Sequence, residues 1–188
     1  ERPREADRVG ETGHTVVDFD TLDVFGVEDV LDVGGGEPLF SAFTFEDWAL
    51  LTLRFEFHLL THAFRKDVND ADRVGIPLDH ISFYYSKYFK KQFNPKFFGV
   101  DSVREVVDYI SDTVVVCRST QAELLEGLLP GELEAPSVLA MLAEEARRHR
   151  NRRIDLGDDT ARLRLTRPHL PPGAAAAAAA GATWSGAG

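Results

Sequence analysis

A long apolar stretch between residues 45 and 66 restricts the possible folds more than any other part of the sequence. Its apolar residues recur every three or four positions, as on a helix face. They form two adjoining stripes, namely Trp48, Leu51, Phe55, Leu59 and His62, and then Leu50, Leu53, Phe57, Leu60 and Phe64. Glu46 and Asp47 in the first turn and Arg65-Lys66 in the last turn suit the helix dipole. So broad an apolar surface predicts a helix that is buried on more than one side.

Two shorter helices and a strand are predicted after this first helix. The sequence 75–78 leads into the second helix, and Pro77 suits its first position because a missing N–H costs nothing there. Asn94-Pro95 interrupts the pattern, and Asp101 or Ser102 can cap the third helix. Residues 113–117 are mostly β-branched and of strand length. This order predicts a mainly α fold, a compact three-helix, helix-turn-helix or winged-helix-like core with a short β wing.

Composition divides the chain into four segments. We expect an acidic, largely disordered arm at 1–36, with a short strand at 15–19 and a short helix or docking segment at 21–33. The helical core follows at 37–118. A helical extension at 119–167 contains expected helices at 121–129 and 136–150 and a short strand at 162–165. Residues 168–188 form a Pro/Ala/Gly low-complexity tail outside the fold.

Charge is distributed unevenly along the chain. The net charge is −10, and residues 1–50 account for it with thirteen acids against three arginines. Residues 51–188 hold eighteen acidic and eighteen basic residues and are neutral overall. The triple glycine at 34–36 is interpreted as a linker, because Glu37-Pro38 follows and an acid there would repel the anion of a phosphate loop.

The acid-free stretch from Ser82 to Phe98 is the strongest candidate binding site. Basic side chains neutralise phosphates and aromatic faces stack on unpaired bases, and the candidate residues are Tyr84, Tyr85, Lys87, Lys90, Lys91 and Lys96. Alternatively, the aromatic residues belong to the core and the lysines are merely solvated. A second basic cluster, Arg147, Arg148 and Arg150, is interpreted as a phosphate-binding patch, a nuclear-import signal or a complement to the helix dipole.

Four short motifs in this region resemble a known domain family. They are Gly75-Ile76-Pro77-Leu78, Tyr88-Phe89, Phe98-Gly99-Val100 and Asp112 to Val116. In this order they resemble the LOTUS (OST-HTH) family over roughly residues 46–118, although the linker 68–75 is longer and more charged than the family pattern. The resemblance implies RNA, including G-rich structured RNA, or a DEAD-box helicase as the partner. Residues 36–67 are also similar to uncharacterised algal-protist proteins, which add no function.

Other kinds of chemistry find little support in the sequence. His58 and His62 have the spacing of a metal-binding pair, but Leu59 replaces the Glu of the metalloprotease motif and no third ligand is evident. Hence no metal or other cofactor is predicted, and no catalytic residue is evident, so we expect no enzyme. Cys117 is the single cysteine, which is typical of the cytoplasm or nucleus. No apolar run is long enough to span a membrane, and no small-molecule substrate is indicated.

Two functional hypotheses remain open at this stage. The first is a non-enzymatic RNA-associated binding module that acts through the basic, aromatic second helix. The second is a protein-docking module, in which a groove between helices holds a helicase or another RNA-granule partner. The acidic arm is either a solubilising segment or a gate that docks on the Lys87–Lys96 stretch.

Overall fold

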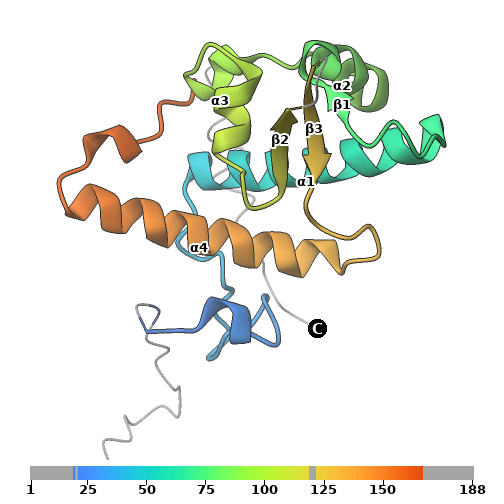
Figure 1. The fold of residues 1–188 in the computed structure, drawn as a ribbon. Helices are drawn as coiled ribbons and strands as arrows, with labels where there is room; N and C mark the ends of the chain where they lie inside the picture. Colours follow the sequence, from blue (N-terminus) through green and yellow to red (C-terminus); the bar gives the residue numbers. More distant parts are fainter. Residues whose placement is uncertain (1–18, 20, 119–121, 167–188) are drawn as a thin grey trace, which may run out of the picture.

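The computed structural model describes residue 19 and residues 21–118 and 122–166. Helix α1 (Phe45–Val68) runs through the middle of the molecule. Helices α2 (Ile81–Phe89) and α3 (Val103–Asp108) and a small sheet lie on one side of it, and helix α4 (Ala135–Asp155) lies on the other (Figure 1). The expected disordered ends lie largely outside the described residues. The mainly α, winged-helix-like architecture predicted from the sequence is confirmed.

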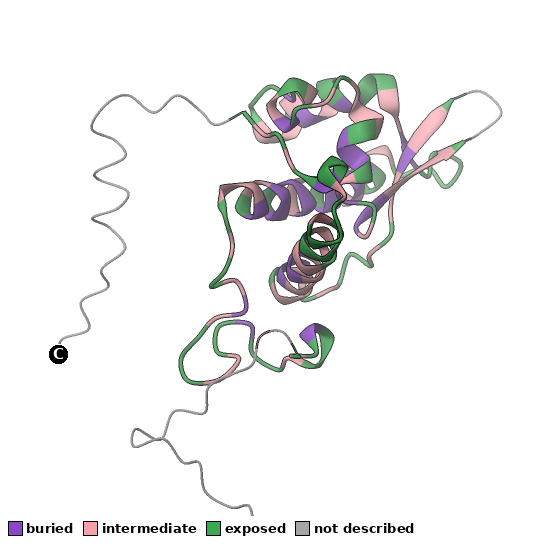
Figure 2. Ribbon diagram, turned by 90° about the vertical axis from the view of Figure 1, so that its left-hand side faces the viewer, coloured by how far each residue is buried: buried purple, intermediate pink, exposed green. Residues whose placement is uncertain are grey.

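Helix α1 begins and ends as the sequence predicts. The Asp47 carboxylate accepts the backbone N–H of Thr44 at 2.8 Å, which caps an otherwise unpaired donor. Asn69 ends the helix in the left-handed conformation with a φ of 45°. Buried residues of α1 point to both sides of the helix. Phe57 packs in the main hydrophobic core, on the side of α2, α3 and the sheet, and Leu51 packs against α4 on the other side. Figure 2 shows buried positions along α1 and on the adjoining side of α4.

The entry to α2 differs from the prediction in its first turn. Pro77 does not begin the helix but belongs to strand β1 (Ile76–Pro77). A 3-10 turn, η2 (Leu78–His80), separates it from α2. Proline has no N–H to donate to a neighbouring strand, so sheets tolerate it mainly in edge strands. Pro77 lies in such a position, in a two-residue strand at the sheet edge. A second 3-10 turn, η3 (Pro95–Phe98), connects α2 to α3, and Ser102 caps α3 through the Glu105 N–H.

The wing is a hairpin, and its second strand was wrongly predicted to be a helix at 121–129. Strands β2 (Val114–Arg118) and β3 (Glu123–Gly127) pair antiparallel, and β1 pairs with the other edge of β3. Leucine and glutamate favour helices, but tertiary packing overrides that preference: Leu125 is fully buried in the main core. Gly127 is required, because a Cβ there would lie 2.7 Å from the Thr61 hydroxyl.

The underside of the molecule consists of α4 and the described part of the N-terminal arm. Helix α4 is longer than the predicted 136–150, and Leu139 and Ala143 pack against Leu51. Below α4, the 3-10 turn η1 (Val24–Gly26) and the segment that follows it form a small cluster of Val24, Val30 and Leu39, which also contacts Met141. This part of the arm therefore docks on α4, whereas α2 lies on the opposite side of α1 (Figure 1).

An internal ion pair, missed at the sequence level, joins α1 to the turn before β2. Arg54 is only 1% exposed, and its guanidinium donates to both carboxylate oxygens of Asp112, at 3.0 and 2.6 Å. It also donates to the carbonyl oxygens of Leu50 and Tyr109. Asp112 opens the Asp112–Val116 motif. A carboxylate at this position of the motif thus has a structural role, because it neutralises the buried Arg54.

The last described residues return to the core without forming the predicted strand at 162–165. After the 3-10 turn η4 (Asp159–Ala161), Leu163 and Leu165 pack against the main cluster. The chain passes so close to η3 that a Cβ on Gly99, whose φ is +76°, would lie 2.4 Å from the Arg164 carbonyl oxygen. The predicted strand at 15–19 falls almost wholly outside the described residues. None of the helices that the structure describes is long and apolar enough to cross a membrane.

Candidate nucleic-acid interface

Helix α2 presents one apolar face to the core and one mixed aromatic and basic face to solvent. Ile81 and Tyr85, four residues apart, are buried, whereas Phe83, halfway between them, is 65% exposed. Lys87 and Lys90 are also exposed. The Lys87 ammonium lies 6.0 Å from the ring centroid of Tyr84 and 5.6 Å from that of Tyr88. This arrangement places a positive charge directly beside aromatic rings.

The aromatic rings of this face are held in place by their neighbours. Tyr84 makes edge-to-face contacts with Phe64 at 5.0 Å and Phe83 at 5.2 Å, and it stacks on Tyr88 with an interplanar angle of 20°. The Tyr88 hydroxyl donates to Asp67 at 2.5 Å. Burial, followed by this hydrogen bond, raises the pKa of Tyr88 to about 12. Tyr88 is therefore a neutral hydrogen-bond donor at physiological pH.

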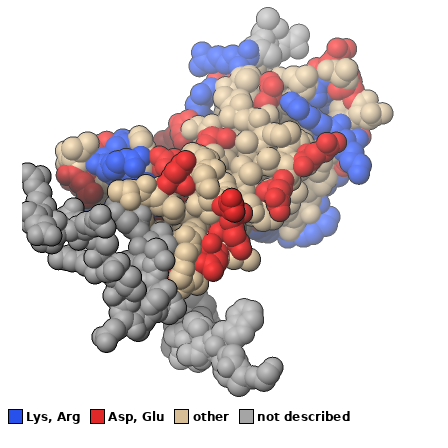
Figure 3. All heavy atoms as spheres, turned by 90° about the horizontal axis from the view of Figure 1, so that it is seen from below, with Lys and Arg blue, Asp and Glu red and all other residues tan. Residues whose placement is uncertain are grey.

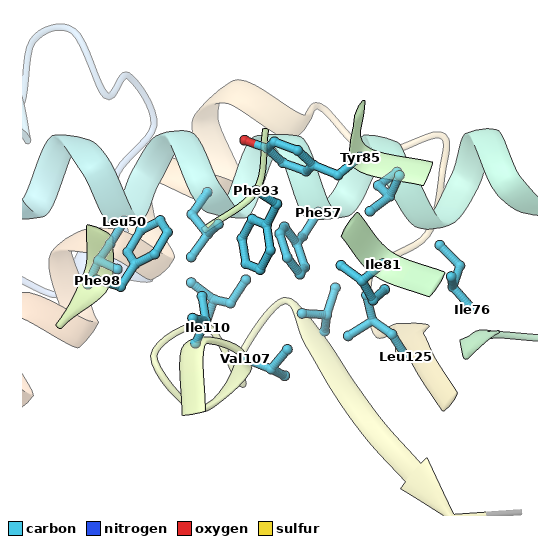
Figure 4. Close-up of a cluster of buried hydrophobic side chains, with 14 of the residues drawn as sticks. Leu50, Phe57, Ile76, Ile81, Tyr85, Phe93, Phe98, Val107, Ile110 and Leu125 are labelled. Carbon is cyan, nitrogen blue, oxygen red and sulfur yellow. The ribbon is translucent and has the colours of Figure 1, made fainter. Parts of the chain in front are cut away.

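Tyr85, predicted to stack on a base, lies inside the molecule. It is 5% exposed and packs against Phe57 and Phe93 (Figure 4). Its hydroxyl donates to Glu56 on α1. Burial, and then Glu56, raise the pKa of Tyr85 well above its usual value. Its ring thus fills the core, and the exposed aromatic residue of α2 is Phe83, which the sequence-based site omitted.

Two of the four predicted lysines have acidic partners from other elements. Lys91 pairs with Glu56, and Lys96 pairs with Asp101. The stretch 82–98 is free of acids in the sequence, but folding places carboxylates from α1 and from the turn before α3 beside it. Lys87 and Lys90 are not paired with a carboxylate in the described part of the chain, and the Lys90 ammonium donates to the Lys87 carbonyl oxygen at 2.8 Å.

The arginines predicted as a second patch are engaged in pairs on α4. Arg147 and Arg148 both bind the carboxylate of Glu144, which is completely buried. Arg150 pairs with the buried Asp47 at the start of α1. On the side of the molecule where α4 lies, basic groups stand apart with acidic groups between them (Figure 3). These arginines lie across α1 from α2, so the two predicted basic regions do not form one surface (Figure 1).

An aromatic groove opens beside the α2 face. It has a volume of about 620 Å³ and lies between the first half of α1 and the α2–α3 connection. Its aromatic lining residues are Phe45, Trp48, Tyr85, Phe93, Phe97 and Phe98. The polar lining residues are Thr52, Glu56, Lys91, Gln92 and Asn94. Trp48 is 44% exposed. Tyr85, Phe93 and Phe98 are buried, so the ring surface that the groove offers to a ligand comes from Phe45, Trp48 and Phe97.

The histidine pair is part of the packing between α1 and the β3–α4 connection. The rings of His58 and His62 have centroids 4.6 Å apart, and the His62 Nε2 lies 3.0 Å from the Leu129 carbonyl oxygen. Burial, and then His62, lower the pKa of His58 below 6.5. Within residues 21–118 and 122–166, no group of three or more histidine, cysteine or acidic side chains is arranged to hold a metal ion.

Comparison with known proteins gives one match. The model of the OST-HTH/LOTUS domain family matches residues 55–125, from the second half of α1 to the middle of β3. Neither the curated proteins nor the solved structures contain a significant match to the chain. The matched region includes α2 and its exposed aromatic and basic face, and it excludes α4 and the N-terminal arm.

Proposed function

We propose that this protein is a non-enzymatic RNA-binding module acting through the outer face of α2. Residues 55–125 match the model of the OST-HTH/LOTUS domain family, whose members bind RNA or protein partners. One observation carries the proposal. The Lys87 ammonium lies within 6.0 Å of two tyrosine ring centroids, beside the exposed Phe83. A phosphate and its base would meet a cation and an aromatic surface on the same face.

The geometry favours RNA with accessible base faces. Aromatic side chains stack on bases that are not covered by a neighbour, as in single strands and at the ends of G-rich structures. Stacking contributes about 1–3 kcal/mol per base. Lys87 and Lys90 would neutralise adjacent phosphates, which makes the affinity dependent on salt. Lys91 and Lys96 would contribute less, because their charges are already balanced by Glu56 and Asp101.

The test compares two pairs of lysines. Binding of single-stranded, duplex and G-rich RNA is measured over a salt titration for the wild type, for Lys87→Ala with Lys90→Ala, and for Lys91→Ala with Lys96→Ala as the matched control. Each phosphate contact contributes about 0.7 to the slope of log affinity against log salt for single strands. The first variant should therefore lower the slope by about 1.4, and the control should retain most of it. If the wild type retains no RNA even at low salt, the proposal fails.

The aromatic groove favours protein docking as the second candidate function. A groove lined by Trp48, Phe93 and Phe97 suits a peptide that buries apolar side chains, and the implied partners are a DEAD-box helicase or another RNA-granule protein. Such binding would depend little on salt. It would be weakened by Trp48→Ala and unaffected by substitution of Lys87 and Lys90, which is the reverse of the pattern expected for RNA.

A further inference from the structure

We propose that the aromatic groove between α1 and η3 binds the protein's own proline-rich segment, residues 167–173, which follows directly on the described C-terminal stretch. The sequence of this segment is Arg-Pro-His-Leu-Pro-Pro-Gly. The inference does not depend on RNA binding. Two observations support it, namely the position at which the described chain ends and the residues that line the groove.

Residue 166 is fixed at the edge of the groove. The backbone N–H of Thr166 donates to the Phe97 carbonyl oxygen at 2.8 Å, and its hydroxyl lies 3.4 Å from the Lys96 carbonyl oxygen. Phe97 lines the groove. Two residues earlier, the backbone of Arg164 lies directly against Gly99. The next residues therefore start beside the groove, and their tethering gives them a high local concentration there.

The lining of the groove suits proline. Proline-rich segments in the polyproline II conformation dock in grooves lined by aromatic residues, because the conformation is preformed and loses little entropy on binding. Six of the thirteen lining residues are aromatic. The ring of Trp48 is fixed by edge-to-face contacts with Phe40 and Phe43, both at 5.3 Å between centroids. A rigid, half-exposed indole is a suitable platform for a pyrrolidine ring.

The segment is long enough to cover the site. Seven residues in the polyproline II conformation span about 22 Å, at about 3.1 Å per residue. Pro168, Pro171 and Pro172 fall within that span. Gln92, Asn94 and Lys91 on the groove's polar side have amide and ammonium groups that can donate to the free carbonyl groups of such a backbone. An external peptide would bind the occupied groove only by displacing the tethered segment.

Trp48 can report on the occupant. The protein has two tryptophans, at 48 and 184, so Trp184→Phe leaves Trp48 as the only indole emitter. Quenching of its fluorescence by acrylamide is measured in this full-length background with the native segment and with Pro168→Ala, Pro171→Ala and Pro172→Ala combined. Ala176→Ser, Ala177→Ser and Ala178→Ser together provide a matched control, with three substitutions in the same tail outside the proline-rich segment.

The expected result is a rise in quenching on loss of the prolines. For a flexible tether the effective concentration is about millimolar, so a segment of millimolar affinity covers Trp48 about half of the time. The triple proline variant should then be quenched about 1.5- to 2-fold more strongly, and the alanine-to-serine control should match its parent. A peptide of residues 167–173, added at millimolar concentration to the triple variant, should restore the protection.

Two results would overturn the inference. In the first, the triple proline variant is quenched no more than its parent and the added peptide has no effect. In the second, quenching falls with protein concentration equally in both proteins, which would identify a second copy of the chain as the occupant. RNA binding by the same variants is measured alongside and should be unchanged. Loss of the Trp48 effect and loss of RNA binding would thus be separate outcomes.

Discussion

Helix α4, and α2 together with the segment that follows it, both carry clusters of basic residues, but folding gives the two clusters different surroundings. On α4, Arg147 and Arg148 close around the buried Glu144, and Arg148 also anchors the arm by donating to the Leu22 carbonyl oxygen at 2.8 Å. On α2, Lys87 rests over tyrosine rings, and its charge is not paired with a carboxylate in the described residues. The arginines hold layers together, whereas Lys87 remains exposed to a ligand.

The location of the acidic partner decides whether a basic cluster stabilises the fold or stays available to a ligand. A buried carboxylate requires compensation, so the arginines beside it are part of the fold. An exposed lysine beside aromatic rings gains little from its neighbours and keeps most of its charge available to solvent and ligands. Lys91 pairs with the half-buried Glu56, so we expect its charge to be less available to a ligand than that of Lys87 and more available than those of the α4 arginines. Substitutions that separate stability from binding therefore test the comparison.

The largest effect is expected at the centre of the α4 cluster. Glu144→Gln removes the charge that Arg147 and Arg148 share, and it leaves those guanidinium groups poorly compensated. Breaking a buried ion pair costs about 3–5 kcal/mol, so we expect a loss of about 3 kcal/mol in the free energy of unfolding. Urea unfolding followed by circular dichroism measures this loss.

A neighbouring glutamate supplies the control. Glu145 pairs with Arg152 at 3.0 Å, but both side chains are substantially exposed. Exposed pairs contribute about 0–1 kcal/mol, so Glu145→Gln should change stability by less than about 1 kcal/mol. Equal effects of the two substitutions would show that the α4 arginines are no more structural than the α2 lysines.

Sequence patterns predicted the architecture well because periodicity and helix caps are local properties. The α1 stripes and Ser102 as a cap both appear in the structure. The errors lie where distant contacts decide the outcome. Strand β3 has a helix-forming composition, but Leu125 is drawn into the core by its pairing with β1 and β2. Pro77 likewise becomes part of a strand only because β3 lies beside it.

The candidate site was predictable only in part. Tyr84 and Lys87 lie on the outer face of α2, and Lys90 ends the helix in the left-handed conformation. The burial of Tyr85 follows from its position four residues after Ile81, and the same spacing could have identified Phe83 as exposed. Glu56 and Asp101 could not have been assigned to Lys91 and Lys96 from the pattern, because their proximity depends on how α1 and α3 pack against α2. No local charge count contains that information.

The next largest effect is expected for the exposed ring of α2. Phe83→Ala removes a stacking surface worth about 1–3 kcal/mol per base, which corresponds to a loss of about 5- to 150-fold in RNA affinity. Because Phe83 is mostly exposed, the free energy of unfolding should change by less than about 0.5 kcal/mol. Fluorescence anisotropy with a labelled single-stranded RNA measures the first quantity and urea unfolding the second. A variant that loses stability but keeps its RNA affinity would identify Phe83 as a packing residue.

A smaller effect is expected from pH on the side of α1 that faces α4. His58 lies on the same helical stripe as Leu51 and Phe55, and its pKa is lowered in the folded protein. The unfolded chain takes up a proton near pH 6.5 that the folded chain resists, so stability should fall as the pH drops through 6.5. The slope from one histidine cannot exceed about 1.4 kcal/mol per pH unit. Arginines keep their charge throughout this range.

Unfolding measured between pH 7.5 and 5.5 checks this expectation. His58→Leu should flatten the pH dependence, because it removes the group that titrates differently in the two states. His149→Leu, at an exposed position among the α4 arginines, is the matched control and should leave the slope as it is in the wild type. A slope that persists in His58→Leu and disappears in His149→Leu would place the acid sensitivity in the arginine cluster instead.

The smallest effect concerns Lys91, which belongs to the α2 region by sequence and resembles the α4 arginines in its pairing. Its ammonium pairs with Glu56 and lies 5.7 Å from the Tyr85 ring centroid, but its side chain is half exposed, which weakens the pair. A double-mutant cycle of Lys91→Met and Glu56→Gln, measured by urea unfolding, should give a coupling energy of about 0.5 kcal/mol. Lys91→Met should also reduce RNA affinity less than Lys87→Met does. A negligible coupling energy together with an equal loss of RNA binding would show that Lys91 is as available to a ligand as Lys87, and that pairing with Glu56 does not divide the α2 lysines into two kinds.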